Sequence, residues 1–182
     1  MARQRLTGVL LVGGASSRFG SPKALARLDG ETLAERAWRI LGEACDERIA
    51  VGKEADEFEL PFPILDDGTE TRAALAGVVA GLRAAANPIA VFLPVDVPLA
   101  TAELVRTLGD ACDEAAVTAT GPLPAAIARA ALPVLERRLE TGGLRLQDAF
   151  DELSTRVIGA DPAELANVNR PGDLEALARD GV

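Results

Sequence analysis

The chain has 182 residues, of which 28 are acidic and 19 are basic, so its formal net charge is −9. A chain of this length suits one domain, which we expect to span residues 1–182. The negative charge argues against a general nucleic-acid-binding protein, because such proteins need a basic face to displace phosphate counterions. Hydrophobic residues make up 48% of the chain, enough for a sizeable core and too much for a disordered protein.

The chain contains no histidine and no tyrosine. Their absence excludes Ser-His-Asp and Cys-His triads, histidine-ligated zinc and acid–base catalysis by histidine. The two cysteines, Cys45 and Cys112, are too few for a disulfide framework, and we expect buried or unreactive thiols. Any chemistry must therefore use carboxylates, Lys, Arg, backbone groups or a hard metal ion.

Apolar segments along the chain are short. None approaches the ~20 residues needed to cross a bilayer, and no signal-peptide core follows the basic start of the chain. We therefore expect a cytoplasmic protein that binds neither membranes nor nucleic acid.

Strand-like and helix-like patterns alternate along the first half of the chain. The predicted strands are short apolar runs that end in turn residues, and the predicted helices repeat apolar residues at helical spacing. The segment at 89–95 is almost wholly apolar, which is typical of a central strand covered on both faces. In chain order we predict a strand at 6–12, a helix at 31–45, strands at 48–52 and 61–65, a helix at 71–86 and the strand at 89–95.

The second half continues the alternation. We predict a helix at 101–112 with Thr101 as its N-cap, strands at 115–120 and 124–128, helices at 131–140 and 144–153, a strand at 155–159 and a C-terminal helix at 171–179. This order predicts a three-layer α/β/α fold with a doubly wound, mostly parallel sheet. Ligands of such sheets gather at the carboxyl ends of strands, so the loops to consider follow Val12, Gly52, Leu65 and Val95.

The first of these loops, at 13–23, reads GGASSRFGSPK. Its three glycines permit close approach of the backbone to a ligand, and Arg18 and Lys23 can bracket an anion. The loop matches neither the dinucleotide fingerprint G-x-G-x-x-G nor the P-loop. Lys23 and Lys53 are the only lysines among the basic residues. We interpret the loop as a phosphate cradle, the alternative being a tight turn with solvated charges.

Acidic and amide side chains mark three other loops. Asp96 follows the apolar strand and suits Mg²⁺, a hard ion that takes oxygen ligands, although Asp is also a common turn residue. Asp66 can accept the paired N–H groups of a guanine base, or can simply be a solvated turn residue. Asn167 and Asn169 precede the last helix, where they can orient a second substrate or cap the helix.

These segments resemble, in order and spacing, the nucleotidyltransferases related to molybdenum cofactor guanylyltransferase. The loop at 10–20 with Lys23 is similar to the signature loop of that family, and Pro-Val-Asp-Val-Pro at 94–98 is similar to its metal-binding aspartate motif. Leu-Ala-Gly at 75–77 matches a mid-chain segment, and Asn-Val-Asn-Arg-Pro at 167–171 resembles a terminal Asn-x-Asn-Thr-Pro. Many nucleotidyltransferases share the first loop, whereas the terminal motif is typical of the molybdenum branch.

The resemblance implies a Rossmann-like fold of the nucleotide-diphospho-sugar transferase type, with Mg²⁺ as cofactor. It implies that Asp96 binds the metal, that Asp66 binds the guanine and that Asn167 and Asn169 bind the acceptor. Catalysis would depend on Arg18, Lys23 and Asp96. The nucleotide would lie against Leu11, Val12, Gly13, Gly14, Lys23, Gly52, Asp66 and Asp96.

The implied reaction joins the GMP part of GTP to the terminal phosphate of molybdopterin and releases pyrophosphate. Because a phosphate nucleophile is already anionic, the reaction needs no histidine. Where some members of the family carry Asn at the end of the second strand, this chain has Gly52, so CTP, ATP or UTP with another phosphorylated acceptor remain alternatives. A further alternative is an inactive nucleotide-binding partner protein. Other proteins of cofactor biosynthesis and the recipient molybdoenzymes are the partners that the resemblance implies.

Overall fold

The computed structural model describes residues 3–13, 22–56 and 59–179. The strands are β1 (Leu6–Leu11), β2 (Arg27–Leu28), β3 (Glu31–Thr32), β4 (Glu47–Gly52), β5 (Ile64–Asp66), β6 (Ile89–Pro94), β7 (Ala115–Thr118), β8 (Gly121–Ala128) and β9 (Thr155–Ile158). The α-helices are α1 (Leu33–Ala44), α2 (Ala74–Ala84), α3 (Ala102–Ala111), α4 (Leu132–Glu140), α5 (Leu146–Phe150) and α6 (Pro171–Arg179). Short 3₁₀ turns occur at η1 (Lys23–Leu25), η2 (Glu54–Asp56) and η3 (Arg129–Ala131).

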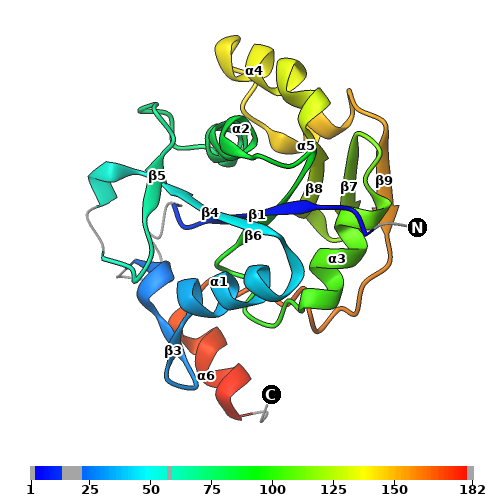
Figure 1. The fold of residues 1–182 in the computed structure, drawn as a ribbon. Coiled ribbons are helices and arrows are strands. Elements are labelled where there is room, and N and C mark those ends of the chain that lie inside the picture. The colour runs from blue at the N-terminus through cyan, green and yellow to red at the C-terminus, as the bar shows by residue number, and fades with distance from the viewer. Residues whose placement is uncertain (1–2, 14–21, 57–58, 180–182) are drawn as a thin grey trace.

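Seven strands form the central sheet, in the order β5-β4-β1-β6-β8-β7-β9. The pairs along β5-β4-β1-β6 are parallel, and β9 is parallel to β7. Only β8 runs antiparallel to its two neighbours in this sheet of the described chain. Helices cover both faces, with α1, α3 and α6 on one side and α2, α4 and α5 on the other (Figure 1). The predicted three-layer fold with a mostly parallel sheet is confirmed.

The two central strands are buried on both faces. Every residue of β1 is buried, and Ile89 to Leu93 of β6 are at most 3% exposed. Alternate side chains of these strands therefore contribute to two separate cores, one against α1 and α3 and the other against α2 and α4. A nearly continuous apolar run is the sequence pattern that such a strand requires.

Helix α2 packs very close to the sheet because its inner face carries glycine. A Cβ at Gly81 would come within 2.6 Å of Val9 Cγ1 and 3.0 Å of Phe92 Cε1. Such contacts are sterically forbidden, so the small residue permits the close approach. The close packing brings the N-terminus of α2 beside the ends of β1 and β4.

Some predicted bounds differ from the structure, since the strand expected at 61–65 begins only at Ile64 and the helix expected at 144–153 spans Leu146–Phe150. The helix expected from residue 31 also begins later. Strands β2 and β3 form an antiparallel hairpin around Asp29 and Gly30, whose φ angles are 53° and 85°. Asp-Gly is typical of a tight hairpin turn because both positions require positive φ. Helix α1 begins at Leu33, because the Thr32 hydroxyl accepts a hydrogen bond from the Glu35 amide while Glu35 accepts one from the Thr32 amide.

Both cysteines lie at helix ends, as C-caps of α1 and α3, and are free thiols. Burial raises the pKa of Cys45 and of Cys112 to about 12. The thiols are therefore protonated and unreactive at neutral pH, as predicted. Within the described residues, no helix combines the length and the apolar character needed to cross a bilayer.

Candidate active site

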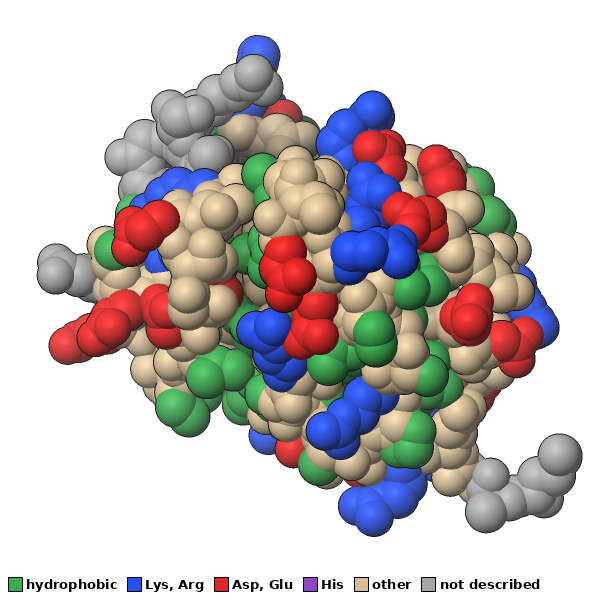
Figure 2. Space-filling model, turned by 90° about the horizontal axis from the view of Figure 1, so that it is seen from above, with side chains coloured by type: hydrophobic (Ala, Val, Ile, Leu, Met, Phe, Trp, Pro, Cys, Tyr) green, Lys and Arg blue, Asp and Glu red, His purple; other side chains and the backbone are tan. Residues whose placement is uncertain are grey.

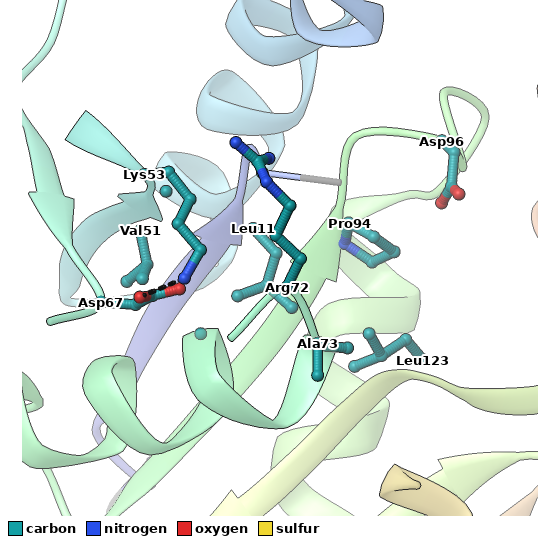
Figure 3. A pocket seen from close by; sticks show the side chains of 13 residues that line it. Leu11, Val51, Lys53, Asp67, Arg72, Ala73, Pro94, Asp96 and Leu123 are labelled. Carbon is teal, nitrogen blue, oxygen red and sulfur yellow. Dashed lines mark hydrogen bonds and ion pairs between the residues drawn. The ribbon is translucent and has the colours of Figure 1, made fainter. Parts of the chain in front are cut away.

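A cavity of about 270 Å³ lies at the carboxyl ends of β1, β4 and β6, beside the N-terminus of α2. This is the edge of the sheet at which ligands were expected. Its apolar surface comes from side chains that include Leu11, Val51 and Leu123, and its polar groups come from Lys53, Asp67, Arg72 and Asp96. Figure 3 shows Lys53 and Asp67 at one side of the cavity and Asp96 at the other.

Lys23 and Asp96 meet beside this cavity. The Lys23 ammonium lies 3.5 Å from Oδ2 of Asp96 and donates a hydrogen bond of 3.3 Å to Oδ1 of Asn169. Three segments far apart in the chain thus converge: the start of η1, the loop after β6 and the segment before α6. The convergence places a cation, a carboxylate and a side-chain amide together at the carboxyl-end edge of the sheet.

The C-terminal segment is held against this loop by its backbone. The amide of Val168 donates to the carbonyl of Asp96 at 2.8 Å, and the Val168 side chain is fully buried. Oδ2 of Asp173 accepts from the amides of Asn169 and Arg170, and these bonds lower the pKa of Asp173. The two asparagines flank buried Val168, and both are exposed.

Asp96 supplies the cavity with a carboxylate that suits Mg²⁺. No cluster of three or more His, Cys, Asp or Glu side chains occurs within residues 3–13, 22–56 and 59–179. Mg²⁺ is commonly held by one or two carboxylates together with substrate phosphates and water. A single carboxylate of this kind therefore fits an ion that arrives with a nucleotide.

A buried ion pair that the sequence analysis did not identify forms the opposite side of the cavity. The Lys53 ammonium donates to Asp67 Oδ1 at 2.7 Å, to the carbonyl of Thr71 at 2.8 Å and to the carbonyl of Thr69. The side chains of Lys53 and Asp67 are only 11% and 6% exposed. These contacts of Lys53 hold the loop between β5 and α2 against the end of β4. Its rarity, as one of two lysines, was the only signal in the sequence.

Asp66, to which the resemblance assigns the guanine base, is not among the residues that line the cavity. Its Oδ2 accepts from the Glu54 amide at 2.6 Å and its Oδ1 accepts from the Gly68 amide at 2.7 Å. These two bonds lower its pKa, and its side chain is exposed. The carboxylate organises its own turn, while the adjacent Asp67 lines the cavity.

Gly52 lines the cavity at the end of β4 and is required there for packing. A Cβ on Gly52 would lie 2.7 Å from Val12 Cγ2 and 3.1 Å from Ile64 Cγ2. Close packing of β1, β4 and β5 therefore explains the glycine without reference to a ligand.

Two further side chains near the cavity, Arg72 and Asp56, were also missed by the sequence analysis. Arg72 Nη2 donates to Asp56 Oδ1 at 2.8 Å. Asp56 Oδ2 lies 3.9 Å from the position that a Cβ on Gly13 would occupy. The pair thus joins η2 to the segment that precedes α2, close to Gly13.

Several residues of the predicted nucleotide site lie at the cavity. Leu11, Gly13, Gly52 and Asp96 line it, and Lys23 reaches it through Asp96. Val12 is buried, with its amide bonded to the carbonyl of Val51 at 3.0 Å. Gly14 and Arg18 lie outside the described residues.

The surface over α2 and α4 carries interspersed basic and acidic side chains (Figure 2). Arg83 Nε lies 2.6 Å from Glu136 Oε1, and Arg138 Nη2 lies 3.4 Å from Asp148 Oδ2. The charges on this face are therefore largely neutralised by near neighbours.

Comparison with known proteins gives both a family match and a fold match. Residues 8–156 match the model of the MobA-like NTP transferase domain. A probable molybdenum cofactor guanylyltransferase of Opitutus terrae is 38% identical over 96% of this chain and 95% of its own length, and one of Chloroflexus aggregans is 33% identical over 94% and 93%. In fold, the chain is similar to the crystal structure of molybdopterin-guanine dinucleotide biosynthesis protein A from Archaeoglobus fulgidus. That likeness has a TM-score of 0.82 and 21% identity, and covers 96% of this chain and 97% of the other.

Proposed function

The chain belongs to the MobA-like NTP transferase family, and we propose on that premise that it transfers GMP from GTP to the terminal phosphate of molybdopterin. The products are molybdopterin guanine dinucleotide and pyrophosphate. One observation carries the proposal: Lys23 and Asp96 meet at one end of a cavity whose lining includes an apolar surface made by Leu11, Val51 and Leu123. Such a cavity suits a base and ribose on the apolar side with the phosphates beside the charged pair.

The reaction requires little covalent assistance from the protein. A phosphate oxygen of molybdopterin forms the new bond to the α-phosphorus of GTP, and the bond from that phosphorus to the bridging oxygen of pyrophosphate breaks. The nucleophile is already an anion, so no side chain has to remove a proton. What the protein supplies is alignment of the reacting groups and neutralisation of the charge that accumulates on the leaving pyrophosphate.

Four side chains and the backbone of one loop take these roles in the proposal. Lys23 and Arg18 neutralise the phosphates, and amides of the loop that begins at Gly13 bind phosphate oxygens. Asn167 and Asn169 bind the acceptor, which places molybdopterin on the side of the C-terminal segment. Because Asn169 contacts Lys23, the acceptor would lie next to the phosphates that it attacks.

We also propose that the reaction depends on Mg²⁺. Asp96 would hold the ion, with substrate phosphates and water as the remaining ligands. When bound, the ion would offset phosphate charge in the transition state. Lys23 would then remain near the same phosphates as a second source of positive charge.

Transfer from another nucleotide is the second candidate function. One observation favours it. The family pattern associates Asp66 with the base, but both carboxylate oxygens of Asp66 already accept hydrogen bonds from backbone amides. CTP, ATP or UTP would then be the donor. In either case we propose a cytoplasmic enzyme whose partners include other proteins of cofactor biosynthesis and the recipient molybdoenzymes.

A transfer assay tests the proposal. Purified protein is mixed with molybdopterin and with GTP, CTP, ATP or UTP, each with Mg²⁺ or with a chelator, and pyrophosphate and dinucleotide are measured. We expect product from GTP only, and only with Mg²⁺. Equal turnover of CTP would favour the second candidate, and nucleotide binding without pyrophosphate release would indicate an inactive binding protein.

A further inference from the structure

We propose that Arg72 and Asp56 together read the base of the nucleotide and select guanine. This rests on the proposed function, since it assigns base selectivity to the same cavity. The ion pair between the two residues, at 2.8 Å, presents a hydrogen-bond donor and an acceptor side by side. Neither residue belongs to the motifs that carry the family resemblance.

The first argument is position. Lys23 and Asp96 mark where the phosphates would bind, so the base would extend toward the apolar surface made by Leu11, Val51 and Gly77. Arg72 lies immediately before α2 on this part of the cavity, and Figure 3 shows its side chain extending across the cavity between Lys53 and Asp96. Asp56 joins it from η2.

The second argument is that most of the other polar groups on this side are already engaged, since Asp67 accepts the Lys53 ammonium and the Thr69 amide through Oδ1. The three donors of Lys53 are used by Asp67, Thr69 and Thr71. Asp66 is bonded to backbone amides, and Gly52 has no side chain. Arg72 is 51% exposed, and a guanidinium carries five donors, of which one is bonded to Asp56 among the described residues.

The third argument is chemical complementarity. The Watson–Crick edge of guanine presents the acceptor O6 next to the donors N1–H and N2–H. A guanidinium beside a carboxylate offers the matching donor and acceptor. Adenine and cytosine present an amino group, which is a donor, next to a ring nitrogen, which is an acceptor. Their amino group would face the donors of Arg72, and their ring nitrogen would face the acceptor oxygens of Asp56. Uracil shares two groups of the guanine edge but lacks the amino group and the second ring.

Binding of four nucleotides to single variants tests the assignment. The dissociation constants of GTP, ITP, ATP and CTP are measured by calorimetry with MgCl₂, because ITP differs from GTP only by lacking the 2-amino group. In Asp56→Ala we expect the preference for GTP over ITP to fall by about tenfold, since the acceptor for that amino group is removed. In Arg72→Ala we expect the preference for GTP over ATP to fall by a similar factor.

Two further variants separate base reading from general charge. Arg72→Lys keeps the positive charge but not the planar fork of donors. Compared with Arg72→Ala, it should regain nucleotide affinity without regaining the preference for GTP over ATP. Arg83→Ala is the matched control, because Arg83 lies near the other end of α2, is 56% exposed and forms a similar ion pair with Glu136 at 2.6 Å. It should leave every ratio unchanged. Melting temperatures of all variants verify that the fold is intact.

The results that overturn the assignment are specific. If Arg72→Ala weakens the binding of all four nucleotides by the same factor, Arg72 contacts the phosphates or the ribose and not the base. If Asp56→Ala leaves the GTP-to-ITP ratio unchanged, the carboxylate does not bind the 2-amino group. If the wild-type protein selects GTP through these residues but transfers no GMP, the proposed function alone is refuted. If the Arg72 and Asp56 variants transfer GMP and keep the wild-type preference for GTP, this inference alone is refuted.

Discussion

The Lys23 ammonium nitrogen lies 3.5 Å from Oδ2 of Asp96, although the two residues follow different strands. The strands concerned, β1 and β6, are parallel neighbours whose last residues, Leu11 and Pro94, are paired in register. The loops that follow them therefore leave the sheet at the same edge. A cationic loop and an acidic loop are brought together by the direction of two strands.

Replacing Asp96 tests the acidic half of this arrangement. Asp96→Ala should lose most of the turnover in the GMP-transfer assay, because it removes the carboxylate at the phosphate end of the cavity. The fold should survive, since the contact that holds the C-terminal segment uses the Asp96 carbonyl, which alanine retains. Circular dichroism and melting temperature verify this. Asp113→Ala, which removes an exposed partner of Arg156, should leave turnover unchanged. Normal GMP transfer by Asp96→Ala with Mg²⁺ would refute the metal assignment.

Replacing Lys23 tests the cationic half. Lys23→Ala should reduce kcat by about 10²-fold or more, the usual effect of removing one group that stabilises charge in a transition state. The loss should appear in kcat more than in the KM for GTP, because the charge it offsets grows as pyrophosphate leaves. Arg156→Ala, an exposed cation remote from the cavity, is the control. A change confined to KM would mean that Lys23 only binds the nucleotide.

Asn169 separates acceptor binding from positioning of the lysine. If Asn169 binds the acceptor molybdopterin, Asn169→Ala should raise the KM for molybdopterin by about tenfold and leave the KM for GTP nearly unchanged. Steady-state kinetics with each substrate varied in turn measure both values. A fall in kcat without a change in either KM would instead show that Asn169 acts by orienting Lys23, to which it is bonded.

The Lys53–Asp67 pair should be important for stability. Lys53→Ala leaves Asp67 buried without its partner, and breaking a buried ion pair in this way costs about 3–5 kcal/mol in the free energy of unfolding. Urea denaturation measures this loss. Arg39→Ala, in which a half-exposed arginine is removed from Glu31 and Glu43, should cost under about 1 kcal/mol. Equal effects of the two substitutions would contradict the importance given to burial.

Asp173 should contribute a pH-dependent part of the stability. Its pKa is lowered in the folded chain by the Asn169 and Arg170 amides, so its contribution is complete above the ordinary value of 3.8 and is lost as the pH falls through the lowered pKa. Asp173→Asn should therefore be less stable than the wild type at neutral pH, and the difference should shrink in acid. Urea midpoints measured from pH 7 to about pH 2.5 test this. A difference that is constant with pH would contradict the role of the charge.

The elements of the fold were predictable because their signals are local. The apolar run at 89–95 predicted a central strand, and β6 lies between β1 and β8. Thr101 was predicted as an N-cap, and its hydroxyl accepts from the Leu104 amide. The hairpin of β2 and β3 was missed even though Asp29-Gly30 is a recognisable turn signal. The apolar residues after residue 31 repeat at helical spacing, which predicted a helix where the second strand of the hairpin lies.

By itself, the sequence determined the alternation of strands and helices, the absence of histidine chemistry and the loops that carry Lys23 and Asp96. Each of these depends on residues close together in the chain. Tertiary structure alone decided that Asp67 rather than Asp66 lines the cavity, and that Lys53 and Arg72 face it. Adjacent aspartates in a turn have the same local chemistry, and their directions depend on how the end of β4 packs against the loop before α2. Partners brought together by that packing leave no pattern in the linear chain.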